Sequence, residues 1–208
     1  MLISLHLSRQ SIANTLASLG IEIPRNQETV YPGTCRPASL LSNSPETLGD
    51  LKKVWRIALP KNCHVEFNDL ALGTQSQNLN TEVGYFVLRR NNGLFTYQLA
   101  VVVDDAEQGI THIVRGKDLL SNTARQIYLQ ELLGYRRPEY LHLPLVLDEY
   151  GEKLSKQTLA TQIHTQDEKH SLIELRKAAK HLGLKNLPDG EGITIAEWLL
   201  AATHAWRG

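Results

Sequence analysis

Hydrophobic and polar positions form their clearest pattern in the second half of the chain. The run Leu99–Val103 is short and rich in β-branched residues, and Asp104 and Asp105 follow it directly. A run of this kind is typical of a strand that is buried on both faces of a parallel sheet. We therefore predict a strand at residues 99–103. Its carboxyl end would lie where open α/β sheets bind their ligands.

A helix and a second strand are predicted after this run. Thr123 and Gln126 have the spacing of a capping box, apolar residues recur at helical intervals from 123 to 133, and Gly134 follows. Residues 141–147 form another apolar run. Strand, helix and strand together make a βαβ-like unit, which predicts an α/β fold.

Weaker patterns flank this unit on both sides. Ser171 and Thr194 each precede a glutamate by three residues, which predicts two helices near the carboxyl end. Three segments before residue 90 alternate or cluster as strands do, and they are Val54–Leu59, Cys63–Phe67 and Val83–Leu88.

A loop with paired lysines follows the second predicted strand. Gly151 begins it, and Lys153 and Lys156 flank the hydroxyl of Ser155. Such a loop can close over a triphosphate, where its ammonium groups would meet negative charge that grows as the α-phosphate is attacked. A plain solvated loop is the alternative that this tetrapeptide leaves open.

Composition narrows the class of protein. The 208 residues suit one domain or a domain with a subdomain, and Lys plus Arg equals Asp plus Glu at 22 each. No global field draws the chain to nucleic acid, so an RNA partner would need a local basic face. Cys35 and Cys63 offer no disulfide framework, which predicts a cytoplasmic protein. No apolar run approaches the length of a membrane span.

Three ordered motifs carry a family resemblance. Phe95–Asp105, Ile113–Asp118 and Lys153–Gln157 resemble, in order and spacing, the second half of the class I glutamyl-tRNA synthetase core. Within that group they are most similar to the glutamyl-Q tRNA(Asp) synthetases. The last motif corresponds to the KMSKS signature. The resemblance implies a Rossmann-like α/β core with an inserted α+β subdomain and carboxyl-terminal helices.

The resemblance also implies roles for individual residues. Tyr97 and Arg115 match the positions that hold the glutamate substrate, and a guanidinium suits a carboxylate because it can donate two parallel hydrogen bonds. An ion pair of Arg115 with a nearby aspartate is the alternative. Lys156 matches the lysine that binds ATP and stabilises the activated phosphate, with Lys153 and Ser155 assisting in catalysis.

Other polar residues receive no single role. Asp104 and Asp105 would hold a ribose, a substrate amine or a structural turn, and these alternatives stay open. His142 is expected to be a hydrogen-bonded core histidine rather than a catalytic base. The reaction needs no base from the protein, since the glutamate carboxylate itself attacks the α-phosphate. Mg²⁺ would accompany ATP without a full protein cage.

The zinc site of the glutamyl-Q family is only half matched. Tyr31 and Cys35 fit the second half of its pattern, whereas Leu5 and Leu7 stand where paired cysteines are expected. Zinc needs about four ligands, and leucine offers none. We therefore predict no zinc.

The resemblance implies glutamate, ATP and tRNA(Asp) as partners, with transfer of glutamate to queuosine. No His-x-Gly-His segment of the HIGH type occurs, so we expect an amino-terminally truncated relative that forms no adenylate alone. A non-catalytic tRNA-binding remnant and a glutamyl-tRNA synthetase fragment are the alternatives, the latter disfavoured by Gln157 and the early end.

The protein would be a monomer if its core is complete, and an exposed sheet edge would allow association. The predicted divisions are an acceptor-binding and zinc-like subdomain at 1–94, the second half of the core at 95–157, and a stem-contact-like helical segment at 158–208.

Overall fold

The computed structural model describes residues 2–5, 17–18, 54–154, 163, 165–190 and 192–206, and of residues 2–5 only the backbone. They belong to two compact units. Unit 1 takes residues from 1–68, 74–111 and 121–139, and unit 2 from 69–73, 112–120 and 140–208. The strands are β1 (Leu2–Leu5), β2 (Val54–Ile57), β3 (His64–Asp69), β4 (Gly73–Asn78), β5 (Val87–Arg89), β6 (His112–Gly116) and β7 (Glu139–Leu143). The helices are α2 (Leu79–Glu82), α3 (Tyr97–Glu107), the 3₁₀ turn η1 (Lys117–Leu119), α4 (Leu120–Leu133), α5 (Glu168–His181) and α6 (Ile195–Ala205).

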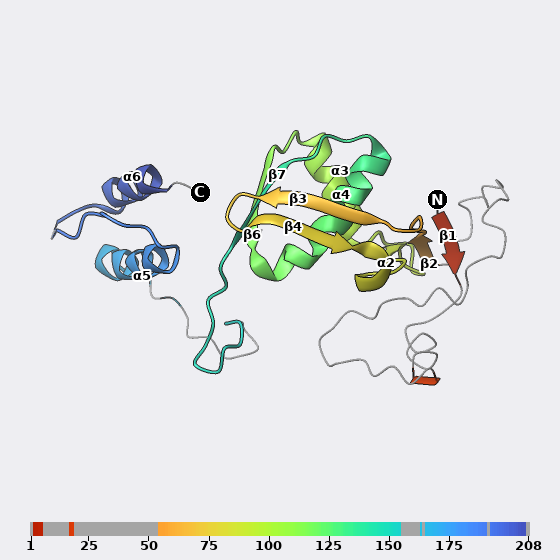
Figure 1. Ribbon diagram of the computed structural model, residues 1–208. Helices are drawn as coiled ribbons and strands as arrows, with labels where there is room; N and C mark the ends of the chain where they lie inside the picture. The colour runs from red at the N-terminus through yellow and green to blue at the C-terminus, as the bar shows by residue number, and fades with distance from the viewer. Residues whose placement is uncertain are drawn as a thin grey trace. The chain divides into compact units, whose positions relative to one another are not determined.

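The strands form two sheets. One has the order β1-β2-β5, in which β2 pairs antiparallel with both neighbours. The other has the order β4-β3-β7-β6. In this second sheet β3 pairs with β7 in parallel, whereas β3 and β4 run in opposite directions (Figure 1). The sheet is therefore mixed, and with its helices it fits the predicted α/β class.

The predicted strand at 99–103 is wrong, because these residues lie in helix α3. The N–H of Ala100 donates to the carbonyl of Thr96 at 3.0 Å, as in a helical turn. A short apolar run does not distinguish a buried strand from one side of a helix, and packing decides between them. Asp104 and Asp105 consequently belong to the last turn of α3 and not to a strand end.

The strand–helix–strand unit is instead made by β6, α4 and β7. Helix α4 begins at Leu120, directly after η1, so the predicted capping box at Thr123 is wrong: Thr123 is fully buried inside the helix. The predicted end is confirmed, since Gly134 follows the helix with φ +70°. Strand β7 ends before Pro144, which lacks the N–H that a ladder needs.

Hydrogen bonds between side-chain amides join helices α3 and α4 of unit 1. The Gln126 side chain donates to Gln98 Oε1 at 3.1 Å, and the Gln98 amide donates to Asn122 Oδ1 at 2.7 Å. Because Gln126 is almost fully buried, its bond to Gln98 satisfies an amide that water hardly reaches. The two bonds link the first turn of α3, which begins at Tyr97, to α4.

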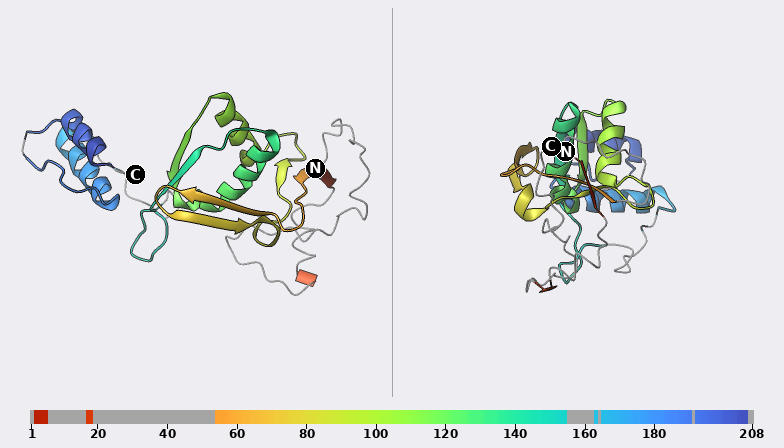
Figure 2. Two further views of the ribbon diagram at one scale, coloured as in Figure 1. Left: turned by 45° about the horizontal axis from the view of Figure 1, so that its top comes forward. Right: turned by 90° about the vertical axis from the view of Figure 1, so that its right-hand side faces the viewer.

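Helices α5 and α6 of unit 2 lie side by side (Figure 2). Leu172, Ala179 and Trp198 form their buried core. Helix α5 starts earlier than predicted, with Asp167 rather than Ser171 as its N-cap. The capping box of Thr194 and Glu197 at the start of α6 is confirmed. Within the described part of the chain, no helix has the length and hydrophobicity needed to cross a membrane.

Replacing the cap of α6 tests how this helix is held. Thr194→Ala removes the hydroxyl that accepts from the Glu197 N–H, and we expect it to destabilise α6 by about 1 kcal/mol. Hydrogen–deuterium exchange of the α6 amides measures this loss. Thr203→Ala is the control, because its exposed hydroxyl bonds only to a carbonyl inside the helix. Equal protection of α6 in both variants would contradict the assigned cap.

Candidate functional site

An aspartate occupies an inward position at the end of β3. The strand alternates exposed and buried side chains, and Val65, Phe67 and Asp69 all face inward. Asp69 is only 1% exposed. Burying a carboxylate is costly unless hydrogen bonds compensate for lost water. The alternation itself is visible in the sequence, so an acidic residue in the inward register was a signal that our sequence analysis missed.

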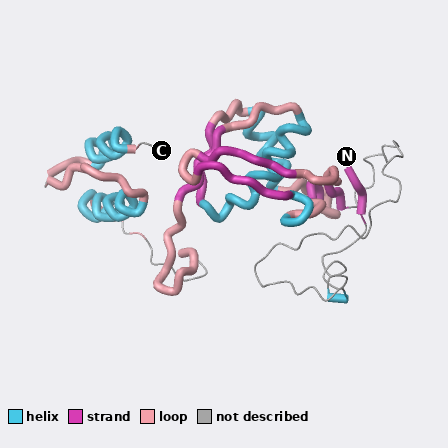
Figure 3. The backbone as a smooth tube through the Cα atoms, viewed as in Figure 1, coloured by secondary structure: helices cyan, strands magenta, loops and turns pink. Residues whose placement is uncertain are grey.

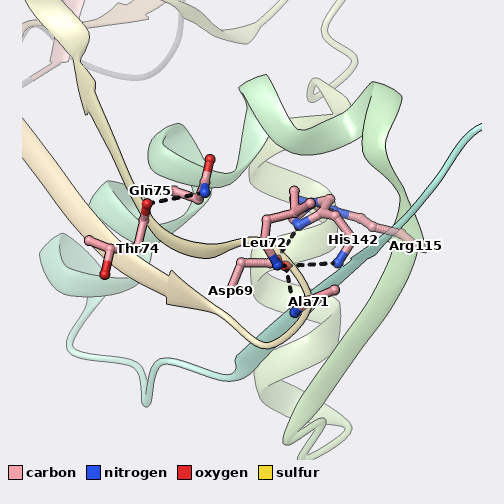
Figure 4. Close-up of polar contacts among 7 residues, drawn as sticks. All are labelled: Asp69, Ala71, Leu72, Thr74, Gln75, Arg115 and His142. Carbon is pink, nitrogen blue, oxygen red and sulfur yellow. Dashed lines mark hydrogen bonds and ion pairs between the residues drawn. The ribbon is translucent and has the colours of Figure 1, made fainter. Parts of the chain in front are cut away.

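Both oxygens of Asp69 are fully engaged (Figure 4). Oδ2 lies 2.6 Å from His142 Nδ1. Oδ1 accepts from the backbone N–H groups of Ala71 at 3.1 Å, Leu72 at 3.0 Å and His142 at 3.3 Å. Burial by itself raises the pKa of Asp69, but the bonds from His142, Leu72 and Ala71 outweigh it and lower that pKa. Asp69 is therefore a carboxylate.

The contacts of His142 fix its tautomer. Arg115 Nε lies 3.1 Å from His142 Nε2, and a guanidinium can only donate, so Nε2 accepts. Nδ1 then carries the proton and donates it to Asp69. His142 is fully buried, as the prediction of a hydrogen-bonded core histidine requires, and this prediction is confirmed.

Tyr140 adds a second contact to the guanidinium. Arg115 Cζ lies 5.5 Å from the centroid of the Tyr140 ring, within the range of a cation–π interaction. Tyr140 and His142 lie two residues apart on β7, share one face of the strand, and have rings 8° from parallel. Asp69 and Tyr140 are register partners across the β3–β7 pair. Neighbouring strands thus bring Asp69, His142 and Arg115 together.

The paired-lysine loop begins as one arm of a hairpin. Leu147 and Lys153 form an isolated antiparallel bridge, and the Leu154 N–H donates to Val146 O at 2.9 Å. The Asp148 carboxylate closes the turn by accepting from the backbone N–H groups of Tyr150 and Glu152. Figure 3 shows this segment as loop after β7. The hairpin sets where the Lys153 side chain begins.

Lys153 makes an ion pair inside unit 2. Its Nζ lies 2.5 Å from Asp118 Oδ2. The hydrogen bond from Lys153, above all, lowers the pKa of Asp118, and the charge of Arg115 lowers it further. Gly116 leaves room for this carboxylate, since a Cβ there would stand 2.5 Å from Asp118 Oδ1. Asp118 therefore forms an ion pair with Lys153 and lies three residues after Arg115 in the chain.

The structure describes three of the five predicted site residues. Arg115 and Lys153 belong to unit 2, and Lys153 forms an ion pair with Asp118 there. Tyr97 belongs to unit 1, at the start of α3, and is 49% exposed. Ser155 and Lys156 lie outside the described residues. The functional roles of all five remain predictions.

Among the described residues, no group of three or more His, Cys, Asp or Glu side chains is arranged to hold a metal ion. The zinc prediction concerns Tyr31, Cys35 and Leu7, which lie outside the described residues, and Leu5, of which only the backbone is described. That prediction therefore stays untested.

Comparison with known proteins identifies the family. Residues 20–184 match the family described as tRNA synthetases class I (E and Q), catalytic domain. The chain belongs to this family. Class I tRNA synthetases are ligases that use ATP and Mg²⁺, so the family supports the predicted enzyme class.

Two curated relatives show to which kind of synthetase within the family the chain is similar. The chain is 50% identical over 201 residues to the glutamyl-Q tRNA(Asp) synthetase of Burkholderia cenocepacia, covering 96% of this chain and 63% of that protein. It is 47% identical to the same-named protein of Cupriavidus metallidurans, covering 96% of this chain and 59% of that protein. The chain thus spans about three fifths of the length of these curated relatives.

A solved structure agrees with the family assignment. A glutamate tRNA ligase from Elizabethkingia meningosepticum, crystallised in complex with its amino acid, superposes with a TM-score of 0.59 at 29% identity. The match covers 75% of this chain and 32% of that one. The α/β core of a class I synthetase is therefore the shared architecture.

The Asp118–Lys153 pair predicts a pH dependence of stability. Because the folded pKa of Asp118 lies below its ordinary value of 3.8, the pair contributes stability above that pH and loses it as the pH falls through the folded pKa. Both side chains are a third or more exposed, so the contribution is about 0–1 kcal/mol. Urea unfolding of wild type and Asp118→Asn should differ at pH 6 and converge once the pH has fallen below the folded pKa of Asp118. A difference that persists in acid would contradict the pair as its cause.

Proposed function

We propose that this chain takes part in the glutamyl-Q tRNA(Asp) synthetase reaction. Glutamate is activated with ATP, and the glutamyl group is then transferred to queuosine of tRNA(Asp). The names of relatives up to 50% identical over 96% of the chain support this substrate class. The observation that carries the proposal is the ion pair between Asp118 and Lys153, which holds a residue predicted to assist catalysis in the same unit as Arg115, the residue predicted to hold glutamate.

The first step joins two anions, and this determines what the protein must supply. An oxygen of the glutamate carboxylate attacks the α-phosphorus, the bond to the β-phosphate breaks, and pyrophosphate leaves with its electron pair. Positive groups that face the growing negative charge lower the barrier. In our proposal Lys156 meets the α-phosphate, while Lys153 and Ser155 assist, and Mg²⁺ accompanies the nucleotide.

The ion pair of Lys153 bears on this role. An ammonium group has three N–H donors, and one of them is directed at Asp118. The remaining donors suit a phosphate oxygen, so Asp118 can hold Lys153 in place while Lys153 contacts the nucleotide. The side chain of Lys153 is 50% exposed, which leaves it accessible to such a ligand.

Arg115 and Tyr97 are proposed to hold glutamate. A guanidinium meets a carboxylate with two parallel hydrogen bonds, and an ammonium cannot reproduce this geometry. Tyr97 can add one hydrogen bond through its hydroxyl. Arg115→Lys should therefore raise the KM for glutamate about 10- to 100-fold, whereas Tyr97→Phe should raise it less. The KM for ATP should change little in either variant.

Glutamate-dependent ATP–pyrophosphate exchange measures these constants in a chain that forms the adenylate. Where no exchange occurs, isothermal titration calorimetry measures the Kd for glutamate and for ATP, and the same changes are expected in the Kd as in the KM. Arg136→Lys is the matched control, because it makes the same change from arginine to lysine at an exposed position. Lys156→Ala should abolish exchange by lowering kcat. Exchange in the wild-type chain would overturn the expectation that it forms no adenylate alone. tRNA retention without exchange would instead favour a non-catalytic tRNA-binding protein, and an unchanged glutamate KM in Arg115→Lys would contradict the assigned substrate site.

A further inference from the structure

The buried contacts around Asp69 suggest more than a stable core. We propose that Asp69 and His142 are positioning residues that fix the guanidinium of Arg115 for the glutamate carboxylate. This inference rests on the proposed function. Neither residue is proposed to touch substrate, and both act through Arg115.

The hydrogen bonds run in one direction from the arginine to the aspartate. Arg115 Nε donates to His142 Nε2 at 3.1 Å, and His142 Nδ1 donates to Asp69 Oδ2 at 2.6 Å. Because His142 must present an acceptor at Nε2, its proton must lie at Nδ1, where the Asp69 carboxylate holds it. The charge of Asp69 thereby selects the tautomer that can receive Arg115.

Burial makes this arrangement rigid. The side chains of Asp69 and His142 are both 0% exposed, so water cannot replace either bond. Three backbone N–H groups hold Asp69 Oδ1, which prevents the carboxylate from turning. Tyr140 contacts the guanidinium at 5.5 Å. The plane of the guanidinium is thus set by one hydrogen bond and one aromatic contact, as bidentate recognition requires.

The chain also contains an exposed pair of the same chemistry. His170 Nδ1 lies 2.6 Å from Asp167 Oδ2, but these side chains are 59% and 54% exposed. Asp167 is the N-cap of α5, and among the described residues neither it nor His170 has a hydrogen bond to an arginine side chain. Because asparagine also caps helices well, Asp167→Asn is a matched control that preserves the fold.

The decisive variant is Asp69→Asn. An asparagine amide can donate to His142 Nδ1, which would move the imidazole proton to Nε2 and leave Arg115 Nε facing another donor. Nitrogen-15 NMR of labelled histidine and arginine reads both changes directly. We expect the protonated nitrogen of His142 to switch and the Arg115 Nε–H signal to shift, whereas Asp167→Asn should change neither.

Kinetics then test whether the orientation matters. Asp69→Asn should raise the KM for glutamate about tenfold with little change in the KM for ATP. In the Arg115→Lys background the same substitution should have no further effect on the glutamate KM, because both changes act through one guanidinium. A purely structural role would give additive effects on both substrates.

A second pair of variants, both at His142, tests the proposal even if Asp69→Asn does not fold. His142→Gln keeps a donor and an acceptor, so it should preserve the Arg115 Nε–H signal and the glutamate KM, while His142→Leu should not. An unchanged Arg115 signal in both Asp69→Asn and His142→Leu would overturn the positioning role, as would additive kinetics. The expected NMR changes in a chain that binds no glutamate would support the positioning of Arg115 and overturn the proposed function instead.

Discussion

The bond between Asp69 and His142 joins residues 73 positions apart in the chain, at a place that water does not reach. A buried carboxylate is tolerated only where every lone pair has a partner, and this requirement shapes its surroundings. The residues after β3 must turn so that the N–H groups of Ala71 and Leu72 point back at Asp69. Strand β7 must pair in the register that brings His142 to the same carboxylate.

Charges of alternating sign extend from this pair through unit 2. Hydrogen bonds stabilise the charge of Asp69, and Arg115 donates a hydrogen bond to His142. Lys153 and, less strongly, Arg115 lower the pKa of Asp118. Lys153 is the most exposed member of the series. The buried end is thus rigid and satisfied from within, whereas the exposed end is held by an ion pair that water screens.

The two aspartate–histidine pairs of the chain show how burial changes one interaction. Both have an oxygen–nitrogen distance of 2.6 Å. At Asp167 the carboxylate caps a helix and stays in water, so the histidine is an incidental partner. At Asp69 no water can take the place of the histidine, because both side chains are fully buried. Equal distances therefore do not imply equal structural consequence.

The sequence alone was enough to predict the family, the end of α4 at Gly134 and the capping box of α6. Each of these depends on neighbours along the chain or on fixed spacings. The sequence did not determine that residues 99–103 are helical, because a short apolar run satisfies either period until packing selects one. It also did not reveal the buried contact of Asp69 with His142 on β7, or its link through His142 to Arg115. Those contacts join segments far apart in the chain, and only the pairing of neighbouring strands brings them within hydrogen-bonding distance.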